Sequence, residues 1–133
     1  MELSIPAAPA RLAAVRRAAR SYLHGVRGEV ADDVVLALHE AASNAVLHGS
    51  SAGQPVEVVL RVTEQCIEAS VLDHGPDPPA QPPAGADAAE LGAHGRGLWL
   101  LRRLVDEVRI ERVRHGTRVT LRRRLGPPRA LAH

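Results

Sequence analysis

The stretch LHEAASNAVLHG (residues 38–49) sets three polar side chains at intervals of four along an otherwise mostly apolar, helix-compatible run. On a helix, Glu40, Asn44 and His48 lie nearly above one another and form a single polar stripe. Burying the carboxylate of Glu40 without a partner would cost roughly several kcal/mol. The polar stripe must therefore face solvent, a metal ion or a ligand.

The same stretch contains an incomplete zinc-protease motif. The H-E-x-x-H pattern needs a second histidine one turn after the first, so that two imidazoles share one face of the helix. In HEAAS (39–43) that position is Ser43, which argues against zinc. Two interpretations remain from this stretch alone: the solvated face of an amphipathic helix, or a ligand site.

Two later segments favour a ligand site. VLDHG (71–75) ends an apolar run in Asp-x-Gly, where Asp73 can accept a hydrogen bond from a closely approaching ligand or can simply form a turn. GAHGRGLWL (92–100) places Gly95-x-Gly97 at the mouth of a helix. The N–H groups of a helix N-terminus attract phosphate, although glycines there also merely loosen a loop.

The hydropathy pattern predicts an α+β fold. Its periodicity indicates a short strand (1–7), two helices (9–28 and 30–48) and a hairpin (56–62 with 66–73). A long Pro/Gly/Ala-rich loop (74–95), a third helix (96–108) and a second hairpin (108–113 with 117–124) follow. We expect a two-layer α/β sandwich, with helices on one face of a mainly antiparallel sheet. Residues 1–125 would form one domain and 126–133 a flexible tail.

Composition excludes several functional classes. The 133 residues are 45% hydrophobic without phenylalanine, so the core must consist of aliphatic side chains. Cys66 is the single cysteine, and no apolar run approaches the ~20 residues that cross a bilayer. We expect a cytoplasmic protein without a membrane partner. A net charge of +2 with one Trp and one Tyr argues against direct nucleic-acid binding.

The order of the motifs is more specific than any one of them. The chain contains, in order, a helical E-x-x-x-N, a D-x-G at the end of a strand, a lid, a G-x-G-L that opens a helix, and HGTRVTL (115–121) at the start of a strand. This order resembles that of the GHKL, or Bergerat-type, ATP-binding fold. The resemblance covers about residues 5–124. Within that superfamily, the chain is most similar to the bacterial anti-sigma-factor serine kinases.

The resemblance implies a role for each motif residue. Glu40 corresponds to the general base and Asn44 to the Mg²⁺ ligand, which suits a hard amide oxygen. Asp73 corresponds to the carboxylate that reads the adenine amine, with Gly75 leaving room for the base. Thr117 would complete the adenine pocket through water.

The lid and the first helix supply the remaining expected contacts. The resemblance places phosphate-binding residues where the lid meets the third helix, at Gly95, Arg96, Gly97 and Leu98. The family commonly has a second glycine after D-x-G, where this chain has Asp77. Arginine in the first helix contacts partners in the family, so Arg16 is a candidate contact or else an ordinary solvated arginine.

The function implied by the resemblance is that of an ATP-binding switch protein. Such a protein uses ATP and Mg²⁺, binds a sigma factor and phosphorylates an anti-sigma antagonist on serine or threonine. Many relatives form homodimers. The alternative is a nucleotide-gated protein-binding module without kinase activity, which needs the same pocket but no base.

Overall fold

The computed structural model describes residues 1–50, 53–75 and 97–125. In chain order the elements are β1 (Glu2–Pro6), a 3-10 turn (Pro9–Arg11), α1 (Leu12–Tyr22), α2 (Gly28–Asn44), a π-helix (Ala45–Gly49), β2 (Pro55–Val62), β3 (Cys66–Asp73), a helix over 97–104, β4 (Glu107–Val113) and β5 (Gly116–Arg124). The expected tail and most of the expected lid (74–95) lie outside the described residues.

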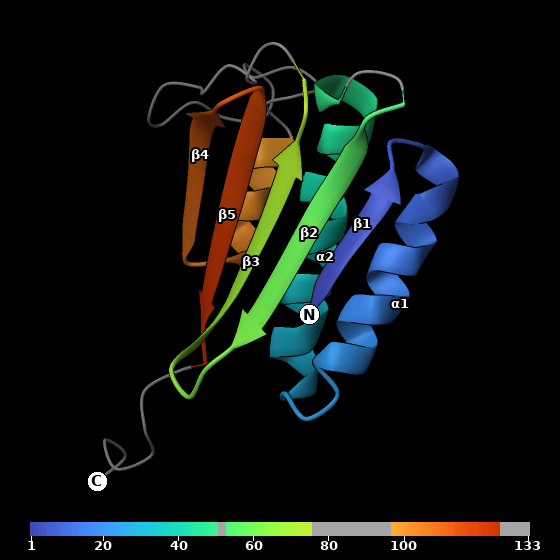
Figure 1. Cartoon of the computed structure of the whole chain (residues 1–133). Helices are drawn as coiled ribbons and strands as arrows, with labels where there is room; N and C mark the ends of the chain where they lie inside the picture. Colours follow the sequence, from blue (N-terminus) through green and yellow to red (C-terminus); the bar gives the residue numbers. More distant parts are fainter. Residues whose placement is uncertain (51–52, 76–96, 126–133) are drawn as a thin grey trace, which may run out of the picture.

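The five described strands form one sheet in the order β1-β2-β3-β5-β4, and every neighbouring pair is antiparallel (Figure 1). Because β5 lies between β3 and β4, the end of β3 meets the start of β5, and Asp73 pairs with Thr117. Side chains alternate between the two faces along each strand. In β3 the residues of one face, from Ile67 to Asp73, are all buried.

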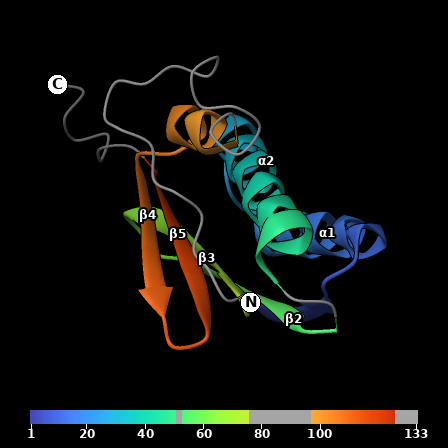
Figure 2. The same cartoon turned by 90° about the horizontal axis from the view of Figure 1, so that it is seen from above.

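The helices α1, α2 and 97–104 cover one face of the sheet, so the fold is the expected α+β sandwich (Figure 2). The core between the layers is aliphatic, and its largest fully buried hydrophobic side chains are Leu23, Leu38, Leu60, Ile67, Val15, Val30, Val56, Val58 and Val71. Each contributes roughly 1.5–3 kcal/mol by leaving water. α2 lies between the other two helices, and its buried alanines (Ala37, Ala41 and Ala42) let its backbone approach the sheet.

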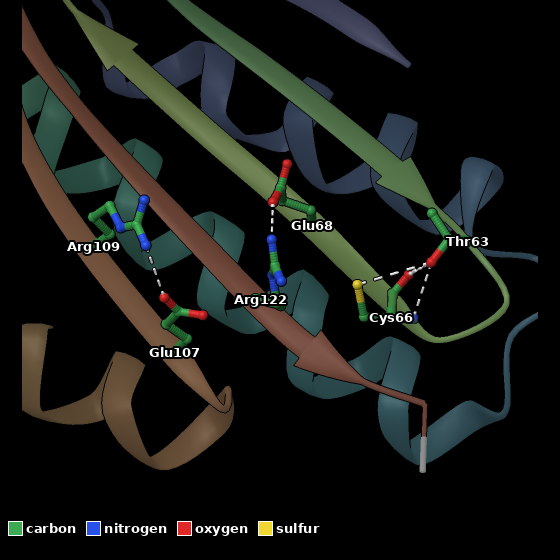
Figure 3. Close-up of polar contacts among 6 residues, drawn as sticks. All are labelled: Thr63, Cys66, Glu68, Glu107, Arg109 and Arg122. Carbon is green, nitrogen blue, oxygen red and sulfur yellow. Dashed lines mark hydrogen bonds and ion pairs between the residues drawn. The ribbon is translucent and has the colours of Figure 1, made fainter. Parts of the chain in front are cut away.

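The opposite face of the sheet is polar. Arg122 on β5 donates to Glu68 on β3 at 2.9 Å, and Arg109 donates to Glu107 within β4 at 3.2 Å (Figure 3). Such exposed pairs contribute little stability each, but they keep this face solvated. The apolar core therefore lies only on the helical side.

Three predicted helix ends are wrong. The first helix was expected to span 9–28, but α1 ends at Tyr22, and Gly28 already begins α2. The third helix was expected to reach residue 108, but it ends at 104, because the N–H of Asp106 already donates to the carbonyl of Arg122 on β5 at 2.8 Å. The second helix changes character after Asn44, where five residues continue as a π-helix. None of the described helices is long and apolar enough to cross a bilayer.

Candidate functional site

The polar stripe of α2 meets the start of the 97–104 helix. Glu40 and Asn44 are half-buried, one turn apart. A Cβ atom at Gly97 would lie 2.7 Å from both Glu40 Oε2 and Asn44 Nδ2, so any side chain there would force the ends of these two side chains to move. The ends of these two side chains therefore lie directly on the backbone at Gly97. The polar stripe thus faces a glycine at a helix start, whereas His48, on the π-helix, is exposed.

Asp73 is a buried carboxylate that the backbone holds in place. Its side chain is 5% exposed, and Oδ1 accepts hydrogen bonds from the N–H groups of Gly75 at 3.0 Å and Thr117 at 3.3 Å. Oδ2 lies against the Cα of Gly49 at the end of the π-helix. Hydrogen bonds to an ionised acceptor are the stronger ones, so one oxygen is anchored and fixes the direction of the other.

Thr117 carries a buried hydroxyl without a partner among the residues that the structure describes. The residue is 1% exposed and lies opposite Asp73 in the β3–β5 register, yet its Oγ1 makes no hydrogen bond to any of them. Leaving a buried polar group unsatisfied costs about 1–3 kcal/mol. An oriented carboxylate beside an unsatisfied hydroxyl offers one acceptor and one donor to a planar ligand that carries both.

The π-helix joins the two parts of the site. It carries the chain from Asn44 to Gly49, and the N–H of Ser50 closes it on the carbonyl of Ala45 at 2.8 Å. The Cα of Gly75 lies against the Gly49 carbonyl, so a side chain at position 75 would collide with backbone. A side chain at position 49 would likewise meet the carboxylate of Asp73, and π-helical turns are frequent at functional sites.

Ser50 is a site residue that the sequence motifs did not indicate. Its Oγ accepts a hydrogen bond from the N–H of His74 at 3.1 Å and donates to the carbonyl of Pro55 at 3.3 Å. These bonds tie the residue that follows Asp73 to the end of the π-helix. The signal available in the sequence was only a serine after the glycine that ends the motif.

The remaining expected residues have different placements. Gly95 and Arg96 lie outside the described residues, as does Asp77. Leu98 is 6% exposed and belongs to the hydrophobic core. Its side chain therefore fixes the start of the helix, and only its backbone is available to a ligand.

Arg16 is exposed on α1 and contacts α2. Its Nη1 donates a hydrogen bond to Nδ1 of His39 at 2.9 Å. Partial burial, followed by the charge of Arg16, lowers the pKa of His39 below its usual 6.5, while the neighbouring Glu40 opposes this shift. His39 is therefore a neutral hydrogen-bond acceptor in the folded protein at neutral pH.

A hollow of about 250 Å³ lies elsewhere, on the polar face of the sheet. Its walls are largely charged and contain none of the motif residues; they are Glu57, Val59, Arg61, Glu68, Ser70, Leu72 and Arg118. Its two carboxylates are not buried and pair with side chains, Glu57 with His74 and Glu68 with Arg122, and none of its described residues has a buried hydroxyl without a partner. The chemistry therefore favours the end of β3 as the functional site.

Two solved structures share this architecture. The crystal structure of the RsbU and RsbW domains of Rv1364c from Mycobacterium tuberculosis matches 93% of this chain and 31% of that chain, with a TM-score of 0.71 and 25% sequence identity. The histidine kinase domain of the blue-light activated histidine kinase from Erythrobacter litoralis EL346 matches 91% of this chain and 62% of that chain, with a TM-score of 0.53 and 24% identity. The chain thus spans about a third of the first and less than two thirds of the second.

The family comparison covers nearly the whole fold. The model of the histidine kinase-like ATPase domain matches residues 5–123, from β1 to the end of β5. No curated protein matches the chain significantly. The family match and the similarity to the RsbW-containing structure confirm the resemblance to a GHKL domain related to the anti-sigma-factor kinases. The chain belongs to the family of histidine kinase-like ATPase domains, and ATP binding is its general property.

Proposed function

We propose that this protein is an ATP-dependent switch of the anti-sigma-factor type, which binds a sigma factor and phosphorylates an anti-sigma antagonist on serine or threonine. The observation that carries the proposal is the contact of Glu40 and Asn44 with the backbone at Gly97. A protein that only bound a nucleotide would not need a carboxylate at this place. The similarity to a structure that contains an RsbW domain supports the same assignment.

The adenine of ATP would lie beside Asp73 and Thr117. The exocyclic amine of adenine donates a hydrogen bond, which Asp73 Oδ2 accepts, because Oδ1 is already occupied by two backbone N–H groups. The unsatisfied hydroxyl of Thr117 donates to a ring nitrogen, directly or through water. Gly75 packs on the Gly49 carbonyl, so no side chain at position 75 projects towards the base. The residues present therefore fit an adenine nucleotide.

The phosphates would lie between α2 and the start of the 97–104 helix. The backbone at Gly97 and Leu98, preceded by Gly95 and Arg96, supplies N–H groups at a helix N-terminus, which attract anions. The amide oxygen of Asn44 is the hard ligand that Mg²⁺ prefers, and Mg²⁺ takes its remaining ligands from phosphate and water. When bound, Mg²⁺ neutralises charge that develops on the phosphates.

Glu40 would act as the general base. It accepts the proton of the acceptor hydroxyl while the hydroxyl oxygen bonds to the γ-phosphorus. The bond between the γ-phosphorus and the bridging oxygen breaks at the same time, and ADP leaves with that oxygen. The position of Glu40 one turn before Asn44 holds the base beside the metal ligand.

Arg16 would contact a protein partner. It is exposed on α1, and its bond to His39 holds the guanidinium on the outer side of the helical layer. A carboxylate of a partner can replace the neutral His39 as acceptor, because bonds between charged groups are stronger. Arg16 thus marks the partner-binding side of the molecule.

Two substitutions separate the kinase from a nucleotide-gated binding module. Glu40→Gln keeps the size of the side chain but removes the proton acceptor, so Mg-ATP binding should persist while phosphotransfer falls about 10²–10⁴-fold. Asn44→Ala should lose both. The assays are calorimetric titration of Mg-ATP and transfer of labelled phosphate to purified anti-sigma antagonists encoded in the source genome.

The matched control is Glu29→Gln, which makes the same chemical change in the exposed first turn of α2. It should behave as wild type in both assays. Undiminished transfer by Glu40→Gln would overturn the role of Glu40 as base. Binding of Mg-ATP without transfer to any antagonist would leave the protein as a binding module.

A further inference from the structure

Two large apolar side chains are exposed on the outer side of the central helix. Leu36 is 45% exposed on α2, and Leu47 is 58% exposed on the π-helix that continues it. Single exposed leucines are common and need no explanation. Leu36 lies seven residues before Ser43, and Leu47 lies four residues after it, so the two leucines share one side of the helix. Glu40 lies between them along the helix axis. We call this set (Leu36, Glu40, Ser43 and Leu47) the outer ridge.

The outer ridge is bordered on both sides. Towards α1, His39 accepts a hydrogen bond from Arg16 at 2.9 Å, and Asp32 forms an ion pair with Arg20 at 2.8 Å. Towards the other helix, Glu40 lies against the backbone at Gly97. Figure 2 shows α2 between these two helices, with the sheet on one side of the helical layer. The ridge therefore faces away from the sheet.

We propose that the outer ridge is the docking surface for the phosphoacceptor protein. This inference rests on the proposed function, because an acceptor hydroxyl must reach the carboxylate of Glu40 to be phosphorylated. The acceptor protein that presents this hydroxyl lies over Glu40, and it therefore also lies over Leu36 and Leu47, which stand on either side of Glu40. Burying an exposed leucine side chain is favourable by roughly 1.5–3 kcal/mol when burial is complete, so both leucines act as anchors.

The spacing of the anchors defines the chemistry of the partner. Leu36 and Leu47 are eleven residues apart, which corresponds to about 16 Å along the helix axis. A single side chain cannot span that length, so the partner must present apolar groups on both sides of its serine or threonine, and a folded antagonist holds both groups in place at once. The exposed arginines along α1, Arg16, Arg17 and Arg20, predict acidic residues on the side of the acceptor that faces α1.

The test uses the anti-sigma antagonist that the wild-type protein phosphorylates. Leu36→Ser should raise the KM for this acceptor about tenfold or more, with kcat and the affinity for Mg-ATP unchanged, since it removes an anchor without placing a charge one turn from Glu40. Leu47→Ser, the same change at the other anchor, should also raise KM. Tyr22→Ser is the control: Tyr22 is 41% exposed at the end of α1, outside the ridge, and its loss should leave KM unchanged.

A synthetic peptide that contains only the phosphorylated segment adds a second test. When the peptide is cut to the acceptor residue and one neighbour on each side, it should be a poor substrate whose KM does not respond to Leu36→Ser, because it reaches neither anchor. An unchanged KM for the folded acceptor with both leucine variants would overturn the docking surface while leaving the kinase assignment intact. A peptide as efficient as the folded acceptor would do the same. Failure of the wild type to phosphorylate any antagonist would instead refute the proposed function, and the docking surface with it.

Discussion

Replacing Thr117 by valine should make the protein more stable and a weaker ATP binder. Valine has the same branched shape and favours strands, but it lacks the hydroxyl that is buried without a partner. Removing an unsatisfied group recovers part of the roughly 1–3 kcal/mol that its burial costs. We expect the free energy of unfolding without nucleotide to rise by about 1 kcal/mol, which corresponds to roughly 3 °C in melting temperature for a chain of this size.

The effect of the same substitution on ATP should have the opposite sign. The hydroxyl would form one hydrogen bond with the bound nucleotide, and a neutral hydrogen bond contributes about 0.5–1.5 kcal/mol. The dissociation constant for Mg-ATP should therefore rise roughly two- to tenfold. Urea denaturation without ATP and calorimetric titration with Mg-ATP measure the two effects.

Thr120→Val is the matched control for this prediction. Thr120 lies on the same strand, β5, but on the polar face of the sheet, opposite Ser70. Its replacement should change neither the ATP affinity nor the stability by more than about 0.5 kcal/mol. A clear loss of stability in Thr117→Val, or an unchanged ATP affinity, would refute the assignment of the hydroxyl to the ligand.

Two further predictions concern α2. In Gly97→Ala, the side-chain ends of Glu40 and Asn44 must withdraw by about 0.7 Å to reach an ordinary contact of 3.4 Å with the new methyl group. Phosphotransfer should therefore fall about 100-fold, with little change in melting temperature. Transfer at the wild-type rate would contradict this prediction. The pKa of His39 is lowered by burial and by Arg16, so the stability that neutral His39 contributes is present above pH 6.5 and is lost as pH falls through the folded-state pKa. An NMR titration should give His39 a midpoint below pH 6.5, and this midpoint should be higher in Arg16→Ala. A midpoint at or above 6.5 in the wild type would refute the lowered pKa of His39.

Much of the fold was predictable because local patterns and topology agree. Alternating apolar residues marked both hairpins within one or two residues of their observed bounds, and a period near 3.6 marked the helices. The spacing of E-x-x-x-N and D-x-G identified residues that the structure places at one end of the sheet. Asp73 and Thr117 are 44 residues apart, yet they pair across β3 and β5, as the resemblance implied.

Other features depend on tertiary contacts that no local pattern contains. The change to a π-helix after Asn44 shifts the backbone bonding by one residue, and the first four residues of the π-helix are neither proline nor glycine. The end of the third helix depends on a hydrogen bond between Asp106 and the distant Arg122. The unsatisfied hydroxyl of Thr117 is visible only once its surroundings are known. These long-range contacts decide the fine geometry of the site.

The most direct test of the adenine pocket is calorimetric titration of Mg-ATP into the wild type and Asp73→Asn. Asparagine keeps an oxygen for the N–H groups of Gly75 and Thr117, but it presents an NH₂ group where adenine also donates. We predict binding to the wild type, about 100-fold weaker binding to Asp73→Asn, and weak binding of Mg-GTP, whose base has a carbonyl in place of the amine. Absence of heat from the wild type at millimolar Mg-ATP, or equal titrations for both proteins, would contradict the pocket.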